Sequence, residues 1–309
     1  MWLILSLACS GKSDPVPPDP TGDSPIGTLA VPPPTFIDEM PPRLVALGDV
    51  HGDLAAARAA LRLAGAIDFE NRWIGGDLVV VQTGDQLDRG DQERQILELF
   101  EELAVAAHEA GGAFYSLLGN HEIMNVEGDF RYVTDAGFGQ FADFPFDPED
   151  PYYAELEEGQ QGRAAAFRPG GPWAVTLAGH NVVMVIGDTG FVHGGILPTH
   201  VDHGLRAINN ETQAWMRGEG DEPSILQSDS APIWTRAYSD DVAEPDCESL
   251  QETIDLLDLK RLVVGHTVWP EINAACDDQV WRIDVGMSEY YGGIPMGLEI
   301  VDGEVTLLE

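Results

Sequence analysis

Three short motifs, each placed directly after an apolar run, constrain this chain more than any other feature. They read GDVHGD at Gly48–Asp53, GDQLDRG at Gly84–Gly90 and GNHE at Gly119–Glu122. The apolar runs before them have the length expected of strands covered on both faces. These predicted strands are Arg43–Leu47, Leu78–Gln82 and Ala113–Leu118. Because α/β sheets place ligands at the carboxyl ends of their strands, we expect the three motifs to meet at one edge.

The polar side chains of these motifs are carboxylates, imidazoles, an amide and one guanidinium group. They belong to Asp49, His51, Asp85, Asp88, Arg89, Asn120 and His121. Carboxylate, imidazole and amide oxygen are ligands of hard or borderline divalent metals. One aspartate shared by two ions would make a two-metal centre, which suits an in-line displacement at phosphorus. A lone histidine before a glycine is more often structural, but that reading does not explain several motifs in register.

In this order and spacing, GDxHG, GDxxDRG and GNHE resemble the motifs of the phosphoprotein phosphatase superfamily of metallophosphoesterases. The segments GDQLDRGD and LLGNHEIMNVEGDFRYV are most similar to the sequences of its bacterial-type Shewanella-like branch. The resemblance runs from about Leu44 to the C-terminus. It implies a calcineurin-like metallophosphoesterase fold, an α/β four-layer α/β/β/α sandwich with its second sheet from the C-terminal half. This catalytic domain would span residues 43–309.

The resemblance also implies a ligand set for two divalent metal ions, which would be Mn, Fe or Zn. One ion would be held by Asp49, His51 and the bridging Asp85. The other would be held by Asp85, Asn120, His193 and His266. Glycines flank these positions, and glycine permits close approach of the backbone to a ligand.

Further roles follow from the same resemblance. His121 would be the general acid that protonates the leaving oxygen, with Asp88 orienting it and favouring its imidazolium form. Arg89 would clamp the phosphate with its planar fork of donors. Arg236, in the sequence WTR, resembles a second phosphate-binding arginine, and Asn120 would also contact phosphoryl oxygens. A structural ion pair between Asp88 and Arg89, or a surface salt bridge of Arg236, remains an alternative.

The implied reaction is hydrolysis of phosphomonoesters, above all on phosphoprotein at Ser/Thr or Tyr, by in-line attack of a metal-bridging hydroxide. Many relatives that cut diesters end in GHxH, whereas this chain has Val268 at the last position, which favours the monoester branch. Two alternatives stay open. One is a diadenosine tetraphosphatase or other small-molecule phosphatase on the same fold. The other is a surface lipoprotein that binds phosphorylated ligands without turnover, for which an intact acid would be unnecessary.

The chain is strongly acidic, with 53 Asp and Glu against 16 Lys and Arg and a formal net charge of -37. Such a field repels nucleic acid and anionic membrane surfaces, so we expect no nucleic-acid partner. Phosphate substrates are also anions, and bound divalent ions with nearby arginines would have to reverse the local potential. The expected partners are therefore a phosphorylated protein or a small phosphomonoester, and the protein is expected to be a monomer.

The N-terminus resembles the end of a bacterial lipoprotein signal over residues 1–9, with Ala8 before Cys9, the residue to be acylated. Ser6 stands where that signal usually has Leu, and no Lys or Arg precedes the apolar run, so a frayed N-terminus is the alternative. Residues 10–42 are rich in Pro, Gly, Ser and Asp and predict a disordered tether. Together they predict a lipid-anchored protein of the cell envelope, periplasmic or at the outer surface. The protein would be cytoplasmic if that reading is wrong.

Three later features leave choices open. An exported location would permit a disulfide between Cys247 and Cys276, with two reduced thiols as the alternative. Residues 130–172 are acidic, aromatic and rich in turns, and predict either a substrate-selecting wall or a packed insertion. Tyr290 and Tyr291 could line the substrate pocket or pack beneath a glycine-rich turn. The remaining predicted elements are paired strands at 181–187 and 189–193, helices at 199–218 and 247–257, and strands at 261–265, 281–286, 297–301 and 305–308.

Overall fold

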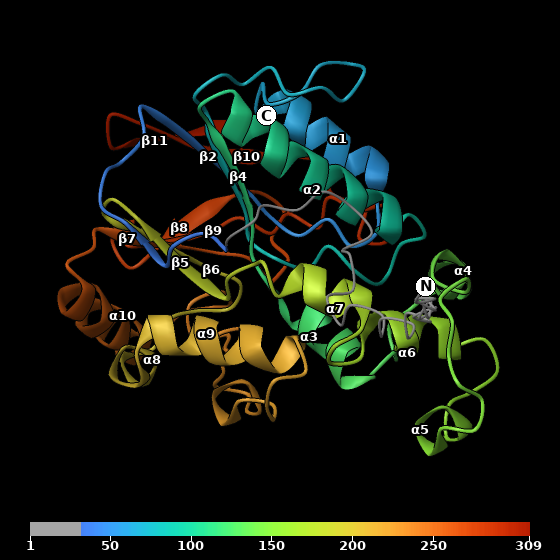
Figure 1. Cartoon of the computed structure of the whole chain (residues 1–309). Coiled ribbons are helices and arrows are strands. Elements are labelled where there is room, and N and C mark those ends of the chain that lie inside the picture. The colour runs from blue at the N-terminus through green and yellow to red at the C-terminus, as the bar shows by residue number, and fades with distance from the viewer. Residues whose placement is uncertain (1–31) are drawn as a thin grey trace, which may run out of the picture.

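The computed structural model describes residues 32–309, which form two sheets packed face to face with helices on both outer sides (Figure 1). This arrangement confirms the predicted four-layer α/β/β/α sandwich. The predicted signal at residues 1–9, including Cys9, and most of the predicted tether lie outside the described residues. The last part of that tether was predicted wrongly, because β1 (Phe36–Ile37) pairs in parallel with β5 (Val183–Ile186). The folded chain therefore begins before residue 43.

The first sheet has the strand order β11-β10-β2-β3-β4, in which β10 spans Gly297–Val301 and β11 spans Glu304–Leu308. Its parallel part contains the three predicted motif strands, which are β2 (Arg43–Leu47), β3 (Val79–Gln82) and β4 (Ala113–Ser116). Helices α1 (Leu54–Leu63) and α2 (Glu93–Glu109) cover its outer face (Figure 1). Helix α1 begins directly after the first motif because the Asp53 side chain accepts a hydrogen bond from the backbone N–H of Ala56 and caps the helix.

The second sheet has the order β1-β5-β6-β7-β9-β8. Its other strands are β6 (Thr189–Val192), β7 (Arg261–Val264), β8 (Asn273–Ala275) and β9 (Val280–Arg282). Its outer layer contains α8 (Pro198–His203), α9 (Leu205–Met216) and α10 (Glu244–Leu257), and a short 3-10 helix spans Ser224–Leu226. A disulfide joins Cys247 of α10 to Cys276 beyond β8, so the disulfide alternative is confirmed.

Two details of the topology differ from the sequence-based expectation. The single helix expected at residues 199–218 is two helices, because Gly204 has a φ of 98° and turns the chain between α8 and α9. The last strands, β10 (Gly297–Val301) and β11 (Glu304–Leu308), lie in the first sheet, where β10 pairs antiparallel with β2. The C-terminal half thus supplies most of the second sheet and also one edge of the first.

The part of the chain between β4 and β5 in the sequence forms a small group of helices. It contains α3 (Asn120–Glu127), α4 (Asp135–Gln140), α5 (Pro151–Ala154), α6 (Gln161–Phe167) and α7 (Pro172–Leu177). The aromatic side chains of Phe141, Phe167 and Trp173 are fully buried there and pack edge to face. No helix in residues 32–309 has the length and apolar character needed to cross a membrane.

Candidate metal centre and active site

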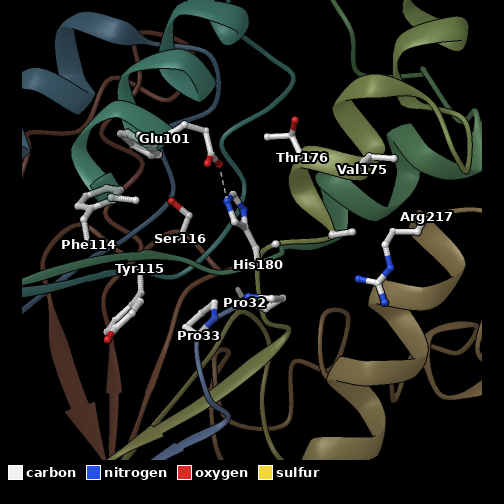
Figure 2. Close-up of a pocket in the computed structure, with 14 residues that line it drawn as sticks. Pro32, Pro33, Glu101, Phe114, Tyr115, Ser116, Val175, Thr176, His180 and Arg217 are labelled. Atoms are coloured by element: carbon white, nitrogen blue, oxygen red, sulfur yellow. Dashed lines mark hydrogen bonds and ion pairs between the residues drawn. The ribbon is translucent and has the colours of Figure 1, made fainter. Parts of the chain in front are cut away.

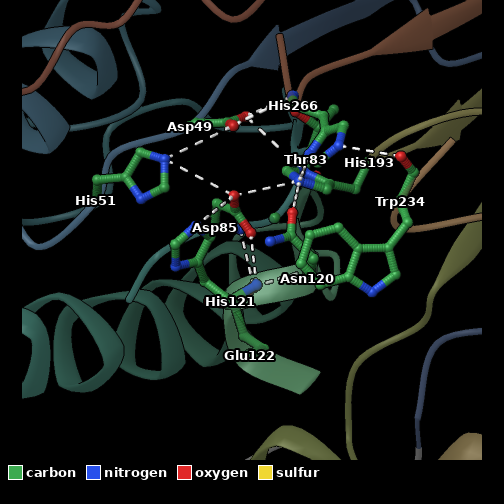
Figure 3. A network of polar contacts seen from close by, with 12 residues as sticks. Asp49, His51, Thr83, Asp85, Asn120, His121, Glu122, His193, Trp234 and His266 are labelled. Atoms are coloured by element: carbon green, nitrogen blue, oxygen red, sulfur yellow. Dashed lines mark hydrogen bonds and ion pairs between the residues drawn. The ribbon is translucent and has the colours of Figure 1, made fainter. Parts of the chain in front are cut away.

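The loops after five strands converge on one cluster of buried side chains (Figure 3). Asp49 and His51 follow β2, Asp85 follows β3, and Asn120 begins α3 after β4. The facing sheet contributes two histidines from the corresponding ends of β6 and β7, which are His193 and His266. The structure therefore brings all six predicted metal ligands together.

Asp85 lies at the centre of this cluster. Its Oδ2 atom is 3.2 Å from His193 Nε2, 3.7 Å from His51 Nε2 and 3.8 Å from His121 Nε2. It belongs to two groups whose possible ligand atoms all lie within 4.8 Å of one another. These groups are His51, Asp85 and His121, and Asp85, His193 and His266. One carboxylate shared by two ligand groups is the arrangement that the bridging role requires.

The remaining predicted ligands complete the two groups. Asn120 Oδ1 is 2.9 Å and His266 Nδ1 is 3.1 Å from His193 Nε2. Asp49 Oδ2 lies 4.0 Å from His51 Nε2, at the margin of the first group, where His121 is the third member. Unprotonated nitrogens and oxygens crowded at these distances repel one another, and a divalent cation between them would turn that repulsion into attraction.

The backbone sets the tautomer of each ligand histidine. His51 Nδ1 is 3.1 Å from Leu87 O, His193 Nδ1 is 3.0 Å from Thr83 O, and His266 Nε2 is 3.2 Å from Trp234 O. A carbonyl only accepts hydrogen bonds, so each of these nitrogens donates, and the other ring nitrogen faces the cluster with its lone pair. Burial lowers the pKa of His51 to about 4 and that of His266 to about 2, which keeps both imidazoles neutral. These residues therefore fit a metal site.

The buried carboxylates support the same conclusion. Burial and the neighbouring Asp284 raise the pKa of Asp49 well above its usual range. Burial also acts to raise the pKa of Asp85, but His193 and His121 outweigh it and hold that pKa well below its usual range. Asp284, which follows β9 and was not predicted, has its pKa raised to about 6 by burial. Buried carboxylates so close together need a compensating positive charge, which divalent ions supply.

Backbone geometry at the site confirms the predicted role of the glycines. A Cβ atom on Gly119 would overlap the Asp85 carboxylate, and one on Gly265 would overlap that of Asp49. His51, Asp85 and His266 have positive φ angles of 41°, 57° and 70°. Non-glycine residues in this region carry strain and concentrate at functional sites.

His121 and Asp88 form a close pair at the edge of the cluster. His121 Nδ1 lies 2.6 Å from Asp88 Oδ2, so the ring donates to the carboxylate and its Nε2 atom faces Asp85. Burial acts to lower the pKa of His121, but Asp85 and Asp88 outweigh it and raise that pKa. The ion pair of Asp88 is made with Arg163, which sequence reasoning missed.

The two predicted phosphate-binding arginines have different contacts. Arg89 is stacked on the ring of Tyr132, with its guanidinium carbon 3.9 Å from the ring centre, and its Nη1 donates to the Tyr290 hydroxyl at 3.0 Å. Arg236 Nη1 donates to the carbonyl of His266 at 3.1 Å, so it contacts the loop after β7 that carries this predicted ligand. A cavity of about 360 Å³ lies between the loops after β2 and β3 and residues 288–290, and is lined by His51, Arg89 and Tyr290 among others.

Glu122, the last residue of the third motif, connects the motif loops, a role that sequence reasoning missed. Its carboxylate accepts hydrogen bonds from the backbone N–H groups of Asp85, Gln86, Leu87 and Gly119. Its presence in GNHE was the available signal, but only the fold shows which loops it ties together. Burial is the main reason that the pKa of Glu122 is raised to about 7.

A second cavity, of about 180 Å³, lies between α2, β4, the end of α7 and residues 178–180, and is lined by none of the predicted site residues (Figure 2). Within it His180 Nε2 lies 2.7 Å from Glu101 Oε1. Its other walls include Phe100, Phe114 and Tyr115.

Two facing sheets with a buried Asp/His/Asn cluster at their strand ends define a two-metal phosphoesterase. Residues 42–270 match the model of the family described as calcineurin-like phosphoesterase, and the chain belongs to that family. It is 42% identical over 296 residues to Shewanella-like protein phosphatase 2 of Arabidopsis thaliana, covering 85% of this chain and 76% of that protein. It is also 28% identical over 276 residues to Shewanella-like protein phosphatase 1 of Plasmodium berghei, covering 85% and 73%.

Solved structures share the fold. A cold-active protein-tyrosine phosphatase of a psychrophilic Shewanella species superposes with a TM-score of 0.69 at 23% identity, covering 90% of this chain and 83% of that one. A protein serine/threonine phosphatase from Saccharomyces cerevisiae does so with a TM-score of 0.59 at 13% identity, covering 89% and 84%. The predicted family resemblance is confirmed. The protein is a metal-dependent phosphatase, a phosphoric monoester hydrolase with two divalent metal ions as cofactors.

Proposed function

We propose that this phosphatase acts on phosphorylated proteins. The observation that carries the proposal is an exposed apolar rim beside the cavity of the site. Its members are Val268, Tyr290, Tyr291 and Ile294, with exposed fractions of 43%, 58%, 38% and 76%. Val268, from the loop after β7, and Tyr291 both lie beside Gly286, and Tyr290 also lines the cavity. The backbone N–H of Gly293 donates to the Gly286 carbonyl at 2.8 Å, which brings the neighbouring Ile294 to the same place. A contiguous apolar surface of this kind suits a polypeptide around the phosphorylated residue better than it suits a free dinucleotide.

The chain's own residues divide the work in this proposal. Bound ions would be held by Asp49, His51, Asp85, Asn120, His193 and His266. When bound, they supply Lewis acidity and an activated water at neutral pH. Arg89 and Arg236 bind phosphoryl oxygens, and His121 gives the proton from Nε2 to the leaving oxygen while Asp88 holds Nδ1.

A substrate panel tests the proposal. Phosphoserine, phosphothreonine and phosphotyrosine peptides are compared with a dinucleoside tetraphosphate and with free phosphorylated amino acids. We expect kcat/KM to be highest on peptides, and truncating the rim with Val268→Ala and Ile294→Ala should raise KM for peptides but not for p-nitrophenyl phosphate. Faster turnover of the dinucleotide would overturn the proposal in favour of a small-molecule phosphatase. Absence of turnover on every substrate would favour a phospho-ligand-binding protein.

We also propose Mn, Fe or Zn as the bound metals, with manganese as the first choice to test. The mixture of imidazole, carboxylate and amide donors supports this group of ions over calcium, which prefers oxygen alone. Metal analysis of the purified protein by mass spectrometry tests it, and calcium as the only bound ion would contradict it.

We further propose that Cys9 is acylated and holds the enzyme in the cell envelope. The disulfide between Cys247 and Cys276 supports an exported location, because disulfides persist mainly in oxidising compartments. Intact mass of protein from the native host should show a lipidated N-terminal Cys9 and no free thiol at the other two cysteines. An unmodified Met1 in the cytosolic fraction would contradict the proposal.

A further inference from the structure

Arg163 is the most deeply enclosed cation that the structure describes near the active site. It lies on α6, far in sequence from every motif, and its exposed fraction is 0%. Its guanidinium carbon is 5.1 Å from the ring centres of both Phe141 and Phe167. An arginine removed from water in this way needs all its charge and donors matched by partners.

Arg163 contacts Asp88, the residue that binds His121, and two further residues nearby. Nη2 donates to Asp88 Oδ1 at 3.2 Å and to Glu93 Oε1 at 2.9 Å, while Nη1 binds the other oxygen of Glu93. Nε donates to Asn125 Oδ1 at 2.7 Å. Glu93 alone would provide a bidentate partner for the guanidinium, so the contact with Asp88 is an additional one that charge neutralisation does not require.

Asp88 is thereby fixed through one oxygen and left free to act through the other. Its Oδ1 atom accepts from Arg163 and, at 3.0 Å, from Asn125 Nδ2. Its Oδ2 atom faces His121 Nδ1 at 2.6 Å. The Asn125 amide also donates to the carbonyl of His121 at 2.8 Å, which ties the helix carrying the histidine to the same carboxylate.

We propose that Arg163 is a positioning residue for the proton transfer, acting through Asp88 on His121. The inference rests on the proposed role of His121 as the general acid. Helix α6 belongs to the segment whose role the sequence left undecided between a wall and a packed insertion. Its function on this reading is to place a buried guanidinium behind the acid, so that the ring keeps its angle to the leaving oxygen. A positioned acid is effective only while that geometry holds.

The experiment compares two leaving groups in single and double variants. Arg163→Met is measured on phosphoserine, whose alkoxide leaves poorly, and on p-nitrophenyl phosphate, whose phenolate leaves without a proton. We expect kcat on phosphoserine to fall by about 10- to 100-fold, a part of the usual contribution of a positioned acid. The fall on p-nitrophenyl phosphate should be several times smaller, and KM and metal content should stay close to those of the unaltered enzyme. Arg168→Met is the matched control, because Arg168 stands at the end of the same helix and pairs with Asp150 at the surface. It should change neither rate.

The double variant separates positioning from a general structural role. In a His121→Asn background, Arg163→Met should cause almost no further loss, because the residue through which it acts is already gone. Arg163→Lys keeps the charge beside Glu93 but lacks the planar fork, so it should show the same pattern with a smaller loss. Arg163→Lys is also the variant to measure if Arg163→Met does not fold.

The outcomes distinguish the inference from the function on which it rests. Equal losses on both substrates, or a full additional loss in the His121→Asn background, would overturn the positioning role. If His121→Asn itself costs the same on both substrates, the acid assignment is wrong and the inference falls with it. If His121→Asn shows the leaving-group dependence and both Arg163 variants do not, only the positioning role is overturned.

Discussion

Two histidine–carboxylate pairs within residues 32–309 look alike when taken alone, although one is buried and the other only partly buried. His121 Nδ1 and Asp88 Oδ2 are 2.6 Å apart beside the predicted metal ligands, and His180 Nε2 and Glu101 Oε1 are 2.7 Å apart in the second cavity (Figure 2). The surroundings of each pair differ. The second oxygen of Asp88 is held by Arg163 and Asn125, and the outer nitrogen of His121 faces Asp85. The outer nitrogen of His180, Nδ1, is buried and has no hydrogen-bond partner among residues 32–309.

This difference shows that a short contact between an imidazole and a carboxylate does not by itself make a catalytic acid. His121 and Asp88, which we propose as the general acid and its orienting carboxylate and call the active pair, lie beside the predicted metal ligands, and Arg163 holds the second oxygen of Asp88. The pair in the second cavity is walled by Phe100, Phe114 and Tyr115 and faces none of the predicted ligands. We therefore expect substitutions to affect chemistry at the first pair and stability at the second.

The largest effect on activity should come from replacing Asp85, the carboxylate shared by the two ligand groups. Asp85→Asn weakens both ligand groups, and losing both ions removes several kcal/mol of transition-state stabilisation, which corresponds to roughly a 10⁴-fold loss of kcat/KM. His266→Asn should weaken mainly one ion. Metal content by mass spectrometry and initial rates check both variants. Full metal occupancy and activity in Asp85→Asn would show that this carboxylate does not bridge.

Replacing the active histidine should give a loss that depends on the leaving group. His121→Asn should cost about 10²–10⁴ in kcat on phosphoserine, because the alkoxide needs the proton, and least on p-nitrophenyl phosphate, with phosphotyrosine between them. Metal content should stay unchanged. Since His121 Nε2 also lies within one of the two ligand groups, loss of an ion in this variant would make it a ligand instead.

The carboxylate of each pair, Asp88 or Glu101, can be replaced by the amide of the same size, which removes its charge. Asp88→Asn should lower kcat on phosphoserine by about 10- to 100-fold, because the amide neither orients the ring as well nor favours its charged form. Glu101→Gln should leave kcat and KM within about twofold. Comparable losses in the two variants would remove the distinction between the pairs.

The smallest effect on activity should come from the second histidine. His180→Gln should leave all rates unchanged while lowering the free energy of unfolding by about 1–3 kcal/mol, since the buried Glu101 loses its partner. Urea denaturation followed by circular dichroism measures this difference. A drop in kcat without a drop in stability would assign the second cavity a part in catalysis.

The sequence predicted the active pair and left the other without a role for a physical reason. Motif residues follow strands that can be recognised as short apolar runs, and β2 begins and ends at the predicted residues, Arg43 and Leu47. Parallel strands then bring their carboxyl ends to one edge whatever the details of packing. The two more distant histidines, His193 and His266, were placed by resemblance, and the second sheet brings them to the same point.

The residues that support the site from outside the motifs could not be predicted from local sequence patterns. Arg163 stands in an irregular segment with no recognisable period, and its partner Glu93 looks like any acidic residue at the start of a helix. Their importance comes from burial against Asp88, which depends on how α2, α3 and α6 pack together. Asp284 is similar, because one acidic residue after a closing strand carries no signal until the two sheets face each other.

By itself, the sequence determined the ligand loops, the family and the class of reaction, because these depend on short local patterns at strand ends. Only the tertiary structure decided that β1 joins the second sheet, that β10 and β11 complete the first, and that Cys247 meets Cys276. It also decided that the Arg163 guanidinium contacts Asp88 and that His180 meets Glu101 in a separate cavity. Edge pairing and buried charge contacts are long-range properties, since they join residues that no local pattern relates.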